Sequence, residues 1–163
     1  MGRKSEQLQI RVTAGQKAML KRRAQASGLD LSSYVLSRAL PAEAERFAAI
    51  VRSVQNDARR SYALAELNDF LVAAAPDTFA ESMDVVPSPA MSAYVRNYVA
   101  AMVEQAAHQK GVDPPGWTHN IEPLAEPHFV TTLTSLRPHL LRAAPVPFKR
   151  RNIFVDAAVG ARI

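Results

Sequence analysis

The chain contains no cysteine, and this absence excludes a disulfide scaffold, a thiolate metal site and a cysteine nucleophile. It also lacks any run of about 18 apolar residues and any signal-peptide core, so we expect no membrane partner and a bacterial, cytoplasmic location. Its six glycines are scattered singly and form no phosphate-binding loop. The composition and the glycine pattern therefore give no sign of a catalytic site.

Histidines and serines do not supply a reaction centre either. None of the histidines is paired at a three- or four-residue spacing, and no serine stands in a strained elbow motif. Three histidines with two glutamates between them could converge in space, although packed or exposed histidines explain the pattern better: His119, His128 and His139, with Glu122 and Glu126. We therefore predict no enzyme activity, no metal and no cofactor.

What the chain does contain begins at its N-terminus, where apolar and polar side chains alternate over residues 7–12. The apolar set is Leu8, Ile10 and Val12, and the polar set is Gln7, Gln9 and Arg11. A two-residue period predicts a strand with one buried face. Because no second strong strand lies nearby, its free N–H and C=O groups call for a second copy of the chain. Two copies would form an antiparallel ribbon, with the polar set on its outer face.

Two short helices are predicted directly after this strand. Thr13 is a helix N-cap, and Gln16 completes a capping box three residues later. Gly28 suits the left-handed residue that ends the first helix. Asp30 is a second N-cap, and its helix is expected to run to about Leu40. One strand and two helices are therefore expected within the first 40 residues.

This order of elements resembles the ribbon-helix-helix family of DNA-binding repressors, the Arc/MetJ type, in which the ribbon enters the major groove. The resemblance covers residues 7–40. It implies a homodimer on double-stranded operator DNA, with Gln7, Gln9 and Arg11 contacting bases. Phosphates would be held at the N-terminus of the second helix and by two N-terminal cations: Leu31, Ser32 and Ser33, with Arg3 and Lys4. An ordinary strand in an α/β domain is the alternative for residues 7–12. Independently, Asp30 could repel the phosphate and serve only as a cap.

The distribution of charge favours the DNA-binding interpretation. Residues 1–40 carry eight Lys/Arg and two acidic residues, a net charge of +6, whereas residues 41–163 have a net charge of −1. Phosphates attract such a basic segment. By contrast, residues 41–136 hold six basic and twelve acidic side chains, and such an acidic body would not bind DNA by itself.

The middle of the chain reads as a helical body. Phe47, Ile50, Val51 and Val54 form one helical stripe, and a second helix is expected from Ser61 to about Ala75. Residues 75–90, with three prolines, are expected to be a loop. Ser88 and Pro89 then resemble an N-cap and a first-turn proline. They would open a helix that ends at Gly111 and presents one apolar face: Met91, Val95, Tyr98, Met102 and Val103.

The C-terminal section combines prolines with large apolar side chains. Seven of the eleven prolines lie in residues 113–147, and this density excludes long helices and central strands. Trp117 and several leucines and phenylalanines make a disordered linker improbable. We therefore expect an ordered, irregular region that packs on the preceding helices or on a partner. Residues 148–156 combine a basic cluster with a strand-like segment.

The motifs PPGWT, EPHF, SLRPHLL and PVPFKRRNIFVD in this section resemble the C-terminal region of bacterial antitoxins that are paired with nucleotidyltransferase-like toxins. The resemblance implies a cognate toxin as partner. Aromatic and arginine side chains are enriched at protein–protein hot spots. The candidate contacts are Trp117, Phe148, Arg150, Arg151, Asn152 and Phe154. A plain intradomain core explains the apolar residues Phe129, Leu136, Leu140 and Leu141 equally well.

The sequence as a whole thus predicts a mainly α protein with one short N-terminal strand. Three regions are expected: a ribbon-helix-helix module at 1–40, a helical body at 41–112 and an irregular proline-rich region at 113–163. The leading functional hypothesis is an antitoxin that represses its own operon as a nucleoid-associated dimer. The alternatives are an accessory protein that helps a plasmid relaxase nick its origin, and a metabolite-responsive repressor with a pocket at Trp117.

Overall fold

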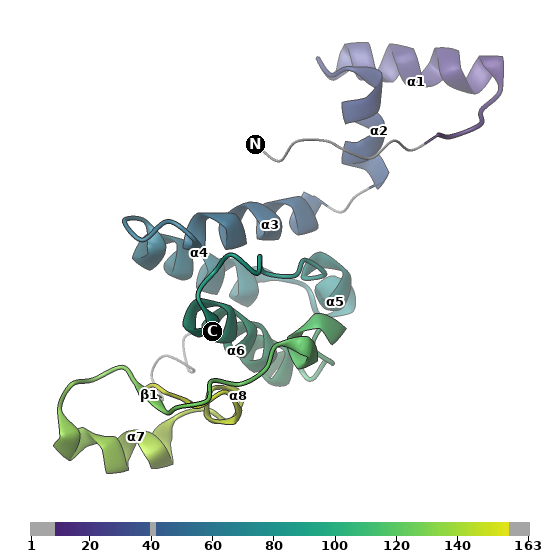
Figure 1. The fold of residues 1–163 in the computed structure, drawn as a ribbon. Helices are drawn as coiled ribbons and strands as arrows, with labels where there is room; N and C mark the ends of the chain where they lie inside the picture. The colour runs from purple at the N-terminus through teal and green to yellow at the C-terminus, as the bar shows by residue number, and fades with distance from the viewer. Residues whose placement is uncertain (1–8, 40–41, 157–163) are drawn as a thin grey trace. The chain divides into compact units, whose positions relative to one another are not determined.

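A computed structural model of the chain describes residues 9–39 and 42–156, apart from the side chains of residues 37–39. It divides into two compact units, Met1–Leu40 and Pro41–Ile163, called here the N-terminal and the C-terminal unit. The described residues are mainly helical, and the helices can be followed in Figure 1. None of these helices has the length and apolar character that a membrane crossing requires.

The N-terminal unit contains the two predicted helices, α1 (Ala14–Ala26) and α2 (Leu31–Ala39). The capping box is confirmed: the Gln16 amide donates to Thr13 Oγ1 at 3.3 Å, and the Thr13 amide donates to Gln16 Oε1 at 2.9 Å. Gly28 has a φ of 67°, as predicted for the left-handed residue after α1. The local boundary signals in this unit therefore act as expected.

Residues 9–12, the described part of the predicted ribbon strand, form no strand in this single chain. A strand needs a hydrogen-bonded neighbour, and the ribbon hypothesis places that neighbour in a second copy. The strand and the dimer thus stay predictions. Gln7 and Leu8 lie outside the described residues.

The C-terminal unit is built on three longer helices, α3 (Ala42–Val54), α4 (Arg60–Ala73) and α6 (Ala93–Lys110). Helix α4 packs against both α3 and α6. The predicted stripe of α3 is confirmed, because Phe47, Ile50, Val51 and Val54 are all buried. Between α4 and α6 lie a 3-10 helix, η1 (Pro76–Thr78), and a short helix, α5 (Phe79–Ser82), so the segment predicted as a loop is partly helical.

The predicted start of α6 is wrong by four residues. Ser92, not Ser88, is its N-cap and accepts a hydrogen bond from the Val95 amide at 3.3 Å. Ser88 instead caps a turn, because its hydroxyl accepts from the Ala90 amide. Serine is a favoured N-cap residue at both positions. The tertiary structure determines which of the two begins the helix. The predicted end at Gly111 is confirmed, with a φ of 67°.

The proline-rich section forms short elements, as its proline density predicts. In chain order they are η2 (Gly116–Asn120), β1 (His128–Phe129), η3 (Thr134–Leu136), α7 (Arg137–Ala143), α8 (Val146–Arg150) and β2 (Ile153–Phe154). Strands β1 and β2 pair in parallel. Trp117, Phe148 and Ile153 join the core of the preceding helices, so residues on both sides of Val112 share one core. The chain does not separate at residue 112 as it does at residue 40.

Candidate nucleic-acid interface

The described part of the predicted DNA-reading segment is exposed. Gln9 and Arg11 are accessible, as a base-reading face requires. Ile10 and Val12, which the ribbon hypothesis buries, are 59% and 43% exposed in the single chain. The other predicted contacts at this end, Arg3, Lys4 and Gln7, lie outside the described residues. The structure therefore leaves both faces of the segment open to a partner.

The start of α2 is capped by Asp30 in two ways. The Ser33 amide donates to Asp30 Oδ1 at 3.0 Å, and the Ser33 hydroxyl donates to Asp30 Oδ2 at 2.6 Å. Both predicted phosphate donors of Ser33 are thus engaged with a carboxylate. The amides of Leu31 and Ser32 remain the better placed donors for a phosphate at this helix end, where the helix dipole favours an anion. The charge of Asp30 opposes that anion.

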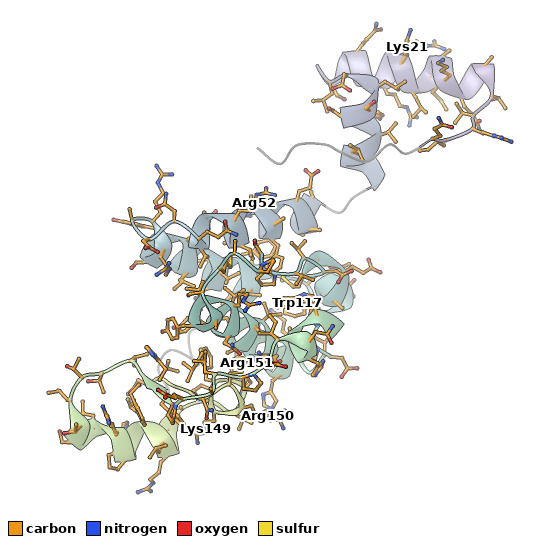
Figure 2. All side chains as sticks on the ribbon, in the orientation of Figure 1. Lys21, Arg52, Trp117, Lys149, Arg150 and Arg151 are labelled. Carbon is orange, nitrogen blue, oxygen red and sulfur yellow. The ribbon has the colours of Figure 1, made fainter. Side chains whose placement is uncertain are left out.

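Helix α1 adds four exposed cations to the unit: Lys17, Lys21, Arg22 and Arg23. Lys21 is labelled in Figure 2. In the described part of this unit, no acidic residue other than Asp30 offsets them. Cations of this kind attract a phosphate backbone whatever its sequence, with a strength that falls as salt rises. The exposure of Lys21, Arg22 and Arg23 fits both a phosphate contact and a plain solvated helix face.

The residues predicted to bind a partner protein lie largely inside the C-terminal unit. Trp117, Phe148 and Phe154 are buried, and the Trp117 indole donates to the Met83 carbonyl at 2.7 Å. Arg151 is only 4% exposed. Buried side chains hold the fold together and cannot be surface anchors while it is intact. Of the six predicted contacts, Arg150 is exposed and Asn152 is half-buried. A role of these residues in partner binding stays a prediction.

Arg151 stands at the centre of a buried polar network. Its guanidinium donates to both carboxylate oxygens of Glu104, at 2.6 and 3.2 Å, and to Asn97 Oδ1 at 3.0 Å. Two carbonyls, those of Thr118 and Ile121, accept the remaining bonds. The sequence analysis missed Asn97 and Glu104, because they stand 54 and 47 residues before Arg151 and no local pattern connects them.

Comparison with known proteins finds a similarity for the N-terminal part of the chain. Residues 2–68 match the family model NikA-like, described as Mobilization protein NikA. No curated protein and no solved structure matches the chain. The matched segment covers the N-terminal unit, α3 and the first half of α4, and none of the proline-rich region. Residues 2–68 are therefore similar to the NikA-like mobilisation proteins.

Proposed function

We propose that this chain is an accessory protein of DNA mobilisation, which binds DNA as a dimer and helps a relaxase to act at a transfer origin. The observation that carries the proposal is the match of residues 2–68 to a mobilisation family. It favours the second hypothesis of the sequence analysis over the antitoxin. The antitoxin resemblance rested on the proline-rich region, and several residues of that region that were predicted to bind a toxin are buried. No observation therefore supports a toxin partner.

The proposed mechanism starts from pairing. Residues 7–12 of two copies form an antiparallel ribbon, which buries Ile10 and Val12 and places Gln9 and Arg11 on the outer face. Their exposure in the single chain supports this proposal, since 59% of Ile10 is otherwise left in water. Arginine pairs with guanine and glutamine with adenine in the major groove. The exposed cations of α1 are available for phosphates beside the groove.

The accessory role follows from the division of the chain. The N-terminal unit carries the basic excess, whereas residues 41–136 are acidic and repel DNA. A relaxase needs its origin presented in a fixed position, and a protein that holds the DNA with one unit leaves the other unit free for such a contact. This mechanism requires no catalytic group in the chain.

The test is an electrophoretic shift and fluorescence anisotropy with transfer-origin DNA from the element that encodes the chain. Arg11→Ala should weaken specific binding by about 1–3 kcal/mol for each lost base contact, and the loss doubles in a symmetric dimer. Arg52→Ala is the matched control, because Arg52 is an exposed arginine on α3 of the C-terminal unit. An Arg11→Ala variant with unchanged specific affinity would exclude base reading by this face.

The accessory role needs a second measurement. The purified chain should raise the nicking rate of the relaxase encoded beside it on supercoiled origin DNA, and the Arg11→Ala variant should raise it less. A relaxase that nicks at the same rate with and without the chain, under conditions where the chain occupies the DNA, contradicts the accessory role.

A further inference from the structure

The C-terminal unit contains a cavity that is lined by none of the residues proposed to bind DNA. It has a volume of about 600 Å³ and is partly open to solvent. Three stretches of chain surround it: the second half of α6, the connection 112–123, and α8 with the residue before and after it. Ligand cavities of drug-sized molecules lie in the range of about 300–1,000 Å³. The cavity has the size of a small-molecule site.

Prolines and aliphatic side chains form much of the wall. Four prolines line the cavity: Pro114, Pro123, Pro145 and Pro147. A proline ring fixes its own backbone angle, so these walls lose little conformational freedom when a ligand binds. Val112, Ile121 and Val146 extend the apolar surface. The cavity therefore offers a preorganised apolar surface to the apolar part of a compact ligand.

Part of the lining is the ion pair between Arg151 and Glu104. The guanidinium donates to five acceptors, and its charge is neutralised by the Glu104 carboxylate. Arginine has five N–H donors, so Arg151 retains little capacity for a ligand. This pair fixes α6 to the end of α8 and holds the shape of the cavity.

The neighbouring residue, Arg150, has the opposite character. It lines the cavity and is exposed, and its side chain forms no ion pair or hydrogen bond with another residue that the structure describes. His108 and His119 also line the cavity and are exposed. With the Arg151–Glu104 pair neutral as a whole, Arg150 gives the lining a positive charge. Figure 2 labels the two adjacent arginines.

We propose that this cavity binds a small organic anion, with its carboxylate, sulfonate or phosphate group on Arg150 and its apolar body between the prolines. Guanidinium groups bind such oxyanions through paired, charge-assisted hydrogen bonds. The imidazoles of His108 and His119 supply further donors beside the anion. Among the described residues, no group of three or more metal-ligating side chains forms.

The experiment uses the full chain and the probe 8-anilinonaphthalene-1-sulfonate, which joins an aromatic body to one sulfonate. Calorimetry should give one strong site for each chain. Arg150→Gln should weaken that site about 10- to 100-fold, because a hydrogen bond to a charged group is lost. Arg142→Gln is the matched control, since this exposed arginine of α7 does not line the cavity. It should leave the affinity unchanged.

A second variant tests the place of binding independently of charge. Val146→Trp fills the cavity from a position that is 58% exposed, so the fold should tolerate it, and it should abolish the strong site. Amide resonances perturbed by the probe should belong to residues 104–108, 112–123 and 145–151. Unchanged affinity in Arg150→Gln or in Val146→Trp overturns the proposal, and so does a wild-type chain without a strong site.

Competition by inorganic phosphate distinguishes the contribution of the ligand's apolar body from that of its negative charge. Phosphate should displace the probe only at concentrations far above those of benzoate, which carries both a ring and a carboxylate. Equal competition by phosphate would mean a simple anion site and would overturn the assigned ligand class. DNA affinity is not the readout, so this result stands or falls separately from the proposed mobilisation function.

Discussion

The two units of this chain differ most in what they do with their apolar side chains. Among the described residues of the N-terminal unit, Ala24 and Tyr34 alone are buried, and Ile10, Val12, Met19 and Leu29 are 42–59% exposed. In the C-terminal unit, large side chains from all three long helices and from the proline-rich region close over one core. A unit of about 40 residues rarely buries enough surface to be stable alone. The N-terminal unit thus has the properties expected of a unit that needs a partner to bury its apolar side chains.

The charges follow the same division. The basic excess lies in residues 1–40, and the C-terminal unit is close to neutral, with an acidic stretch and a basic end. Burial and charge therefore both change at the boundary near residue 40. The N-terminal unit leaves its cations and several apolar side chains exposed to partners. In the C-terminal unit, by contrast, even the guanidinium of Arg151 is buried and paired inside the fold.

The largest effect is expected from Ile10→Lys. Placing an ammonium group on the apolar face of the ribbon leaves a charge without a partner at the proposed interface. The variant should be monomeric in sedimentation at concentrations where the wild type is dimeric, and its DNA binding should fall at least ~100-fold. Val86→Lys is the control, because Val86 is 62% exposed in the C-terminal unit and should tolerate the change. If Ile10→Lys stays dimeric, the C-terminal unit supplies the dimer contact instead.

A large but local effect is expected from Arg151→Ala. It leaves the partly buried Glu104 carboxylate without its partner, and breaking a buried pair costs up to about 3–5 kcal/mol. Denaturant unfolding of the C-terminal unit should measure this loss. Arg150→Ala is a matched control one residue away, and its exposed side chain predicts a change within about 0.5 kcal/mol. Equal losses for the two variants would contradict the contrast between them.

A smaller effect is expected at Asp30. Asp30→Ala removes the cap of α2 and should destabilise the N-terminal unit by about 1 kcal/mol, whereas Asp30→Asn keeps most of the cap. Thermal unfolding followed by circular dichroism checks both values. The same pair of variants tests the helix end as a phosphate site: a marked rise in non-specific DNA affinity for Asp30→Asn would show that the carboxylate repels the backbone.

The smallest effect at neutral pH concerns Tyr98 in the C-terminal unit. Burial, together with a smaller contribution from the neighbouring Tyr94, raises the pKa of Tyr98 from the usual 10.0 to about 12. Because the folded state favours the protonated phenol, this contribution to stability is complete below pH 10 and is lost as the pH rises from 10 to 12. A late phenolate phase in an absorbance titration should vanish in Tyr98→Phe. A titration without such a phase would contradict the burial argument.

Local chemistry in the sequence determined the element boundaries where one side chain meets its own near neighbours. Thr13 with Gln16, Gly28, Asp30 and Gly111 all act as predicted, because each cap or left-handed turn involves residues at most a few positions away. The apolar stripe of α3 was readable for the same reason, since its period depends only on helix geometry. The charge division at residue 40 needed no structure at all.

Tertiary structure alone decided the questions in which the sequence offers equivalent candidates. Ser88 and Ser92 both suit an N-cap, and Arg150 and Arg151 are adjacent residues of one type. What separates each pair is the position of distant segments: Arg151 meets Glu104 and Asn97 across about 50 residues of chain, while Arg150 faces a cavity lined by prolines. The parallel pairing of β1 with β2 has the same origin. Burial depends on which distant segments come into contact. A local sequence pattern does not contain that information, so it cannot predict which of two similar residues is buried.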